Sequence, residues 1–196
     1  MAKIDTLIPF ILHMETGVAR EYLTLPPEQL FERAARQGFA NVHGDRGGLT
    51  MCGVTHATYA YYCGRVGTRP TLSGFRNMTY AVWRDILKTL YWDRWHADEI
   101  RSQPIANILV DWVWASGSIG VKWPQRLLGV TADGIVGEET LRALNAADSR
   151  ELFSKLHDDR IAFVEGIVRH SPSQAKFLRG WERRIDDITF SGLRYD

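Results

Sequence analysis

The sequence predicts an all-α protein, because apolar residues recur at helical spacing along most of the chain and strand signals are nearly absent. With 196 residues, 45% of them hydrophobic, the chain can bury one good core or two small lobes that share one. The clearest helical pattern lies in residues 104–116, where the positions i, i+3, i+4, i+7 and i+8 are occupied by Ile105, Ile108, Leu109, Trp112 and Val113.

The first predicted helix places a carboxylate on its apolar stripe. Thr6 is a reasonable N-cap, and Pro9 falls in the first turn, where a missing N–H group costs little. The spacing of Ile8 and Ile11 continues by four residues to Glu15. We therefore expect Glu15 to face the core, the alternative being that it ends the helix and turns to solvent.

The later helices are delimited by proline, glycine and capping residues. Pro26 and Pro27 open a helix that Gly38 stops, and its apolar face consists of Leu30, Phe31, Ala34 and Ala35. Further helices are expected at 55–63, 79–91, 104–116 and 138–144, then after the N-cap Asp148 and after Pro172. Loops are expected at 41–48, 64–74 and 129–137. Trp83 and Trp112 stand on apolar stripes and are expected in the core.

Composition excludes several classes of protein. A net charge of +1 argues against a nucleic-acid binder, whose affinity would come from clustered Lys and Arg. No run of about 20 apolar residues predicts a membrane span, so no membrane insertion is expected. The apolar stretch 4–12 is interrupted by Asp5 and followed by no small-residue cleavage site, so we do not interpret it as a signal peptide.

The two cysteines predict free thiols and no metal site. If one helix holds both Cys52 and Cys63, their Cα atoms are about 16 Å apart, whereas a disulfide needs less than about 7 Å. No histidine spacing matches them as a zinc site. We expect no cofactor and no metal.

Three residues have the chemistry of glycoside hydrolysis. A buried carboxyl such as Glu15 would hold its proton and act as a general acid. Asp45, in the glycine-rich loop, would stay ionised as base or electrostatic stabiliser, and Thr50 could help to hold a water molecule. Residue types alone leave an alternative open, in which Asp45 begins an ordinary turn by binding its own backbone.

Several motifs resemble glycoside hydrolase family 108, bacterial and phage N-acetylmuramidases also known as secretion-activating proteins. They are E-T-G (15–17), G-F-A-N-V-H-G-D-R-G-G-L-T-M-C-G-V-T (38–55), Y-W-D (91–93) and D-W-V-W-A-S-G (111–117). The family pattern runs roughly E-G-G-[YF]-x-N-x-x-x-D-x-G-G-x-T-x-x-G-[IV]. The resemblance implies that Glu15 is the catalytic acid, with Asp45 and Thr50 beside it, and that Asn41, at the pattern's Asn, binds substrate. The order of Glu, Asp and Thr is also similar to that of phage-type lysozymes.

The second half of the chain resembles a peptidoglycan-binding module. The stretch L-L-G-V-T-A-D-G-I-V-G-E-E-T-L (127–141) contains a D-G-x-x-G-x-x-T signature, and 172–181 is similar to the family's C-terminal helix. The resemblance implies a lysozyme-like catalytic domain in residues 1–117 and a small helical peptidoglycan-binding subdomain in residues 118–196, packed against it. Asp133 and Gly134 are expected to form a tight turn, and only the resemblance implies that they touch peptidoglycan.

The chain departs from the family pattern in its spacing. Glu15 and Asp45 are thirty residues apart, whereas the pattern separates the two by nine. The difference predicts a 21-residue insertion at about 17–37, which contains the helix opened by Pro26 and could reshape the cleft. The pattern's E-G-G is E-T-G here, and Ala115 replaces an Asn that is frequent before S-G.

The resemblance implies cleavage of the β-1,4 bond between N-acetylmuramic acid and N-acetylglucosamine in peptidoglycan. Tyr59 and Trp114 are candidates for stacking on sugars, and Asp111 for lining the cleft or bonding the glycine-rich loop. Alternatives are a lytic transglycosylase and a non-catalytic wall-binding or secretion-assisting protein. Synthesis in the bacterial cytoplasm without a signal peptide, followed by action at the wall or periplasm, would need an export partner, for which a holin-like pore is one hypothesis.

Overall fold

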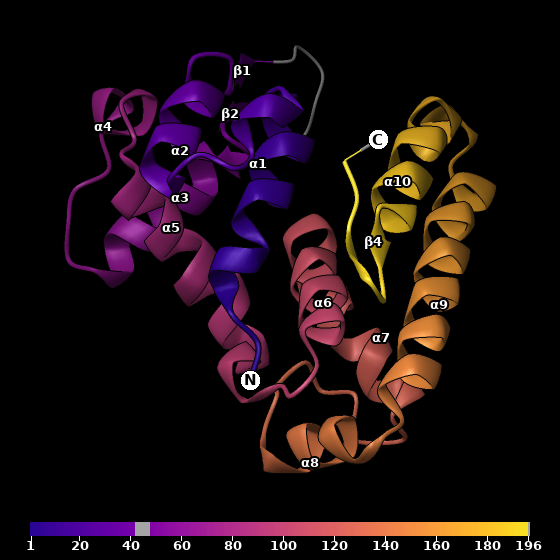
Figure 1. Cartoon of the computed structure of the whole chain (residues 1–196). Coiled ribbons are helices and arrows are strands. Elements are labelled where there is room, and N and C mark those ends of the chain that lie inside the picture. Colours follow the sequence, from indigo (N-terminus) through magenta and orange to yellow (C-terminus); the bar gives the residue numbers. More distant parts are fainter. Residues whose placement is uncertain (42–47, 196) are drawn as a thin grey trace. The chain divides into compact units, whose positions relative to one another are not determined.

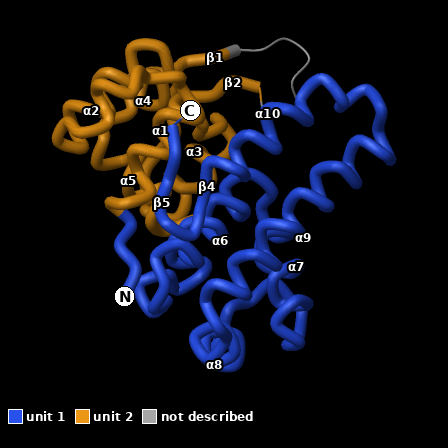
Figure 2. Tube along the Cα trace, turned by 45° about the vertical axis from the view of Figure 1, so that its right-hand side comes forward, with its two compact units in different colours: residues 1–4, 91–196 blue, residues 5–90 orange. Residues whose placement is uncertain are grey.

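The computed structural model describes residues 1–41 and 48–195 (Figure 1). The chain divides into two compact units, one formed by residues 5–90 and the other by residues 1–4 together with 91–196 (Figure 2). The two compact units meet along the chain between Leu90 and Tyr91. The division predicted after residue 117 follows sequence motifs instead, and it stays a prediction.

Helices dominate both units, which confirms the predicted all-α class. In the unit 5–90 they are α1 (Ile8–Thr16), α2 (Pro27–Ala35), α3 (His56–Arg65), α4 (Leu72–Arg76) and α5 (Tyr80–Leu87), with a 3₁₀ turn at Arg20–Tyr22. Thr55 and Thr79 cap α3 and α5 by accepting hydrogen bonds from Thr58 and Val82 backbone N–H groups. A π-helical turn, Lys88–Trp92, continues the chain beyond α5.

Two predicted boundaries in this unit are wrong by a few residues. The N-cap of α1 is Leu7 rather than Thr6, because a 3₁₀ turn at Ile4–Thr6 precedes the helix, while Pro9 does lie in the first turn. The predicted loop 64–74 gives way to α4, which begins at Leu72 after Thr71 accepts a hydrogen bond from Gly74 N–H at 3.0 Å. A short helix with a glycine inside it leaves little helical signal in the sequence.

A small antiparallel sheet was not predicted. Its strands are β1 (Phe39–Asn41), β2 (Leu49–Met51) and β3 (Val54–Thr55), in that spatial order. Ala40 pairs with Thr50, and Thr50 pairs in turn with Thr55. Strands of two or three residues are too short to show an alternating pattern, which explains why the sequence did not reveal them.

The second unit consists mainly of five helices and a terminal hairpin within its described residues. They are α6 (Gln103–Ser116), α7 (Ile119–Leu127), α8 (Glu138–Ala146), α9 (Ser149–His170), α10 (Ala175–Asp186), and the strands β4 (Ile188–Thr189) and β5 (Gly192–Leu193). Shorter 3₁₀ turns occupy Asp93–Trp95, Ala97–Glu99 and Pro172–Gln174. Helices α9 and α10 run side by side (Figure 1).

A local capping signal explains where α9 begins, and close packing on α6 explains why α7 forms. Asp148 caps α9 as predicted, accepting from the backbone N–H groups of Arg150 and Glu151 at 3.0 and 2.8 Å. Helix α7 was missed because Pro124 interrupts its pattern. It packs tightly on α6 at Gly120, where a methyl group would lie 2.5 Å from the Val113 backbone nitrogen.

Both units bury large aromatic side chains. Trp83 in α5 and Trp112 in α6 are fully buried, which confirms both as core residues. Among the described residues, no helix combines the length and the apolarity needed to cross a membrane.

Candidate active site

Glu15 is the last-but-one residue of α1 and is half-buried, between the two alternatives that its sequence position allowed. The helix before it buries Ile8, Phe10, Ile11 and Leu12, which fixes the helix axis in the core of its unit. Gly17 ends the helix in the left-handed region at φ 67°, and its N–H donates to the His13 carbonyl. A helix end held in this way gives the Glu15 side chain a defined starting direction.

The turn between β2 and β3 lies directly against Glu15. Its two residues, Cys52 and Gly53, have φ values of 46° and 79°, as a two-residue hairpin turn of type I′ requires. A methyl group on Gly53 would lie 2.5 Å from Glu15 Cγ and 2.6 Å from Oε2, so only glycine leaves room for the carboxyl group. The T-x-x-G-V motif therefore has a physical reason here, because it sets a bare backbone against the carboxylate.

Cys52 holds this turn in place from the core side. Its backbone N–H donates to the Gly38 carbonyl at 2.8 Å, and its carbonyl accepts from Trp83 Nε1 at 3.0 Å. A methyl group on Gly38 would lie 2.5 Å from Cys52 Sγ, so Gly38 serves close packing more than the helix stop predicted for it. Burial, and then the negative charge of Glu15, raise the pKa of Cys52 to about 12. The thiol is thus neutral and unreactive.

The structure describes two of the three other residues that the family pattern implies beside Glu15. Thr50 is half-buried in the middle of β2, two residues before the turn on Glu15. Asn41 ends β1, where its backbone pairs with Leu49. Asp45 lies outside the described residues. Its role, and those of Thr50 and Asn41, stay predictions.

Tyr59 does not have the exposure that its predicted stacking role needs. It lies on α3 and is 8% exposed, with its ring centroid 5.6 Å from that of Phe75. Its hydroxyl approaches Gly74 so closely that a methyl group there would lie 2.6 Å away. Tyr59 therefore packs within its unit, and its role in binding substrate stays a prediction.

Asp111 is enclosed within the unit that contains α6, and its two predicted roles stay predictions. It is fully buried in α6 and accepts hydrogen bonds from Arg160 Nη2 at 2.6 Å and from Arg184 Nη2 at 2.8 Å. Burial alone would raise the pKa of Asp111, but the charges of Arg184 and Arg160 and their hydrogen bonds hold it below its ordinary value. Asp111 ties α6 to α9 and α10, and helical spacing gave no sign of its arginine partners.

Trp114 remains a candidate for a sugar-stacking side chain. It is half-buried, and its ring lies 4.7 Å from that of Tyr91 at an interplanar angle of 49°. Its predicted role stays a prediction.

The predicted insertion, residues 17–37, docks on its unit. Leu30, Phe31 and Ala34 of α2 are buried, and the Phe31 ring lies 5.7 Å from that of Trp83. The ends of the segment meet, because Gln37 Nε2 donates to the Thr16 carbonyl at 2.7 Å. Helix α2 is thus part of the core, so that removing the whole segment would uncover Trp83.

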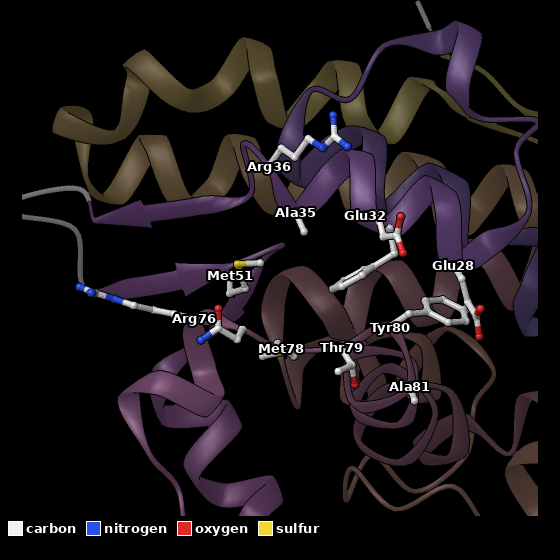
Figure 3. Close-up of a pocket in the computed structure, with 12 residues that line it drawn as sticks. Glu28, Glu32, Ala35, Arg36, Met51, Arg76, Met78, Thr79, Tyr80 and Ala81 are labelled. Atoms are coloured by element: carbon white, nitrogen blue, oxygen red, sulfur yellow. The ribbon is translucent and has the colours of Figure 1, made fainter.

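Helix α2 also forms one wall of a groove of about 700 Å³ (Figure 3). Residues 76–81 form the opposite wall, and Met51 of β2 lies between the two. In Figure 3, Glu28 and Glu32 lie on one side of the groove and Arg76 on the other. Glu15 does not line this groove. The groove is therefore separate from the site of the Glu15 carboxyl group.

The D-G-x-x-G-x-x-T signature is organised by a buried glutamine that the sequence did not single out. Gln125 of α7 donates through Nε2 to Asp133 Oδ1 and to the Ile135 carbonyl, at 3.1 and 2.9 Å. It accepts from Gly134 N–H at 2.9 Å. Hydrogen bonds from Ile135 N–H and from Gln125 lower the pKa of Asp133. The bend predicted at Asp133 and Gly134 is present, with Gly134 at φ 87°.

Comparisons with known proteins agree with this architecture. Residues 34–117 match the family model described as Glycosyl hydrolase 108, and residues 119–186 match the one described as Predicted Peptidoglycan domain. The structure of SagA from Brucella abortus has a similar fold, with a TM-score of 0.66 and 24% sequence identity over 82% of this chain and 91% of that one. No curated protein matches the chain. The first match begins at residue 34, so Glu15 and most of the insertion lie before it.

Proposed function

We propose that the protein hydrolyses the glycan strands of peptidoglycan as an N-acetylmuramidase, because residues 34–117 match the Glycosyl hydrolase 108 family model and residues 119–186 match the Predicted Peptidoglycan domain model. The bond cleaved is the β-1,4 bond between N-acetylmuramic acid and N-acetylglucosamine. Glu15 protonates the leaving oxygen as the general acid.

The observation that supports Glu15 most is the glycine turn against its side chain. Cys52 in this turn costs stability, since a non-glycine residue at positive φ is unfavourable. That cost is understandable if the turn positions the carboxyl group of Glu15, because a general acid must be held within hydrogen-bond reach of the oxygen it protonates. Fixed, partly desolvated carboxyl groups suit this role better than mobile ones.

The other two residues have complementary roles in this proposal. Asp45 stays ionised and stabilises the positive charge that develops on the sugar, or activates the attacking water molecule. Thr50, two residues before the turn, orients that water through its hydroxyl group. Wall binding by residues 119–186 holds the enzyme at its polymeric substrate.

The test compares two isosteric substitutions. Glu15→Gln keeps the shape of the side chain but cannot donate an acidic proton, so release of reducing ends from purified peptidoglycan should fall about 10²-fold or more. Glu21→Gln makes the same change at an exposed position of the same unit and should leave the rate unchanged. Equal rates for Glu15→Gln and the parent protein would contradict the proposal.

Mass spectrometry of the products tests the reaction type. Hydrolysis leaves a reducing N-acetylmuramic acid end, whereas a lytic transglycosylase leaves a 1,6-anhydro end. Anhydro products would keep Glu15 as the acid but replace water by the muramic acid oxygen as the nucleophile. Binding to peptidoglycan without release of either product would instead indicate a non-catalytic wall-binding protein.

A further inference from the structure

Trp83 connects the core of its unit to the turn beside Glu15. It lies in α5, is fully buried, and donates from Nε1 to the Cys52 carbonyl at 3.0 Å. The acceptor belongs to the two-residue turn between β2 and β3, so it is not one of the carbonyl groups that pair the strands. An indole N–H that reaches a turn in this way is a candidate for holding the turn in position.

The turn is fixed from outside its own hairpin. Both backbone polar groups of Cys52 bond to other parts of the unit, the N–H to the Gly38 carbonyl at 2.8 Å and the carbonyl to Trp83. Cys52 has a φ of 46°, a conformation that is unfavourable for a residue with a side chain and persists only where its surroundings hold it. The hydrogen bond from Trp83 comes from a side chain, so a substitution can remove it.

This hydrogen bond acts on the same peptide group that lies against Glu15. A peptide bond keeps the carbonyl group of one residue and the Cα atom of the next in one plane. Fixing the Cys52 carbonyl therefore fixes the Cα atom of Gly53, where an added methyl group would lie 2.5 Å from Glu15 Cγ. One hydrogen bond, one rigid peptide group and one close contact thus link the indole nitrogen to the carboxyl side chain.

Trp83 is itself held by its neighbours. Its backbone N–H donates to the Thr79 carbonyl at 3.0 Å in the first turn of α5. Its ring lies 5.7 Å from that of Phe31, at an interplanar angle of 41°. Phe31 belongs to α2, within the segment predicted as an insertion. The inserted segment therefore packs against the same indole group that bonds to the turn.

We propose that Trp83 is a positioning residue for Glu15, and that its indole N–H, through the peptide group of Cys52 and Gly53, sets where the carboxyl group lies. The inference rests on the role proposed for Glu15 as the general acid. Such an acid must lie within hydrogen-bond reach of the oxygen that it protonates, so a displaced turn slows proton transfer without weakening substrate binding. Glu15 also interacts with other groups, so loss of the N–H should slow the reaction rather than abolish it.

Replacing the indole nitrogen of Trp83 by sulfur tests the hydrogen bond alone. Site-specific incorporation of 3-benzothienylalanine keeps both rings and removes the N–H donor, and Trp83→Phe removes the donor together with one ring. With soluble glycan strands of peptidoglycan as substrate, we expect kcat to fall about tenfold in both variants while KM stays within about twofold. The same two changes at Trp95, which is fully buried with Nε1 unpartnered among the described residues, should leave both constants unchanged.

A double-mutant cycle separates positioning from a general effect on the fold. If Trp83 acts through the carboxyl group, removing its N–H should cause no further loss in the Glu15→Gln protein, whose acid is already absent. A purely structural role would instead lower the residual rate of Glu15→Gln by the same factor as the parent rate. Circular dichroism and thermal melting establish that each variant is folded at the assay temperature. If Trp83→Phe does not fold, the sulfur analogue, which keeps the shape of the side chain, decides.

Two results would overturn the inference. One is a kcat equal to that of the parent protein in the folded sulfur analogue, and the other is an equal loss in the parent and Glu15→Gln backgrounds. Both differ from a failure of the proposed function, in which Glu15→Gln itself retains full cleavage. That failure is measured on the Glu15→Gln protein alone, before Trp83 is changed.

Discussion

Gly53→Ala tests whether the turn on Glu15 positions the catalytic group. The added methyl group would lie 2.5 Å from Glu15 Cγ, whereas carbon atoms in contact are about 3.5–4.0 Å apart, so the carboxyl group must move by about 1 Å. A displacement of about 1 Å can cost about 10²-fold in rate. A non-glycine residue at φ 79° also costs about 1–2 kcal/mol of stability.

Gly67→Ala separates displacement from strain. Gly67 belongs to the same unit and has a similar φ of 73°, but a methyl group there would meet nothing within 4 Å. Both variants should melt a few degrees lower, by about 2–4 °C per kcal/mol for a chain of this size. In a reducing-end assay below both melting temperatures, only Gly53→Ala should lose activity. Full activity in Gly53→Ala, or an equal loss in Gly67→Ala, would refute the reasoning.

Three further predictions concern stability and reactivity. Asp111→Asn removes the counter-charge of two arginines and should lower the free energy of unfolding by about 3–5 kcal/mol in urea at pH 7. Because the pKa of Asp111 is lowered by folding, its contribution is complete above the unfolded value of about 3.9 and is lost as the pH falls through the folded value. Stability of the parent protein should therefore fall in that acid range more steeply than that of Asp111→Asn. Gln125→Leu removes the hydrogen bonds that organise Asp133 and should cost about 2–4 kcal/mol, seen as a lower melting temperature. Cys52 and Cys63 should both react with a thiol reagent in denaturant without reductant, whereas folded Cys52, with a pKa of about 12, should be unreactive at pH 8; absence of thiols in denaturant would contradict the free-cysteine assignment.

Local signals in the sequence were enough to predict most helices. The cap at Asp148 and the stripe that buries Trp112 both depend on neighbours within a few residues along the chain. Such interactions repeat at fixed spacings, so they can be recognised without knowing the fold. Helix α7 breaks this rule because its interior proline hides a helix that packing on α6 stabilises.

Long-range partners could not be predicted in the same way. The arginine partners of Asp111 stand 49 and 73 residues further along the chain, where helical spacing gives no sign of them. Tyr59 was a candidate because aromatic residues bind sugars, but the fold buries it against Phe75. Contacts between residues so far apart leave no periodic signal in the sequence. The residue types of Asp111 and Tyr59 could therefore suggest a role in binding, but not the packing partners that the fold gives them.

The candidate site was predicted in part. The position of Glu15 on its helix followed from apolar spacing, and its half-buried state agrees with a residue at the end of a buried stripe. The turn of Cys52 and Gly53 against it could not be foreseen, because Cys is not a residue that favours a left-handed backbone. The roles of Asp45 and Thr50 still depend on the resemblance.

The hydrogen bond between Gln37 and Thr16 brings the two ends of the intervening segment together, so the segment joins the rest of its unit at one place along the chain while α2 packs on the core. The number of residues between Glu15 and β1 is therefore free to vary without moving either, so separation along the chain is no measure of separation in space. A segment of another length and composition could be grafted between these two residues, provided that it supplies an apolar face to cover Trp83. A change in the segment between Thr16 and Gln37 can therefore give the protein a new surface while the end of α1 that carries Glu15 stays in place.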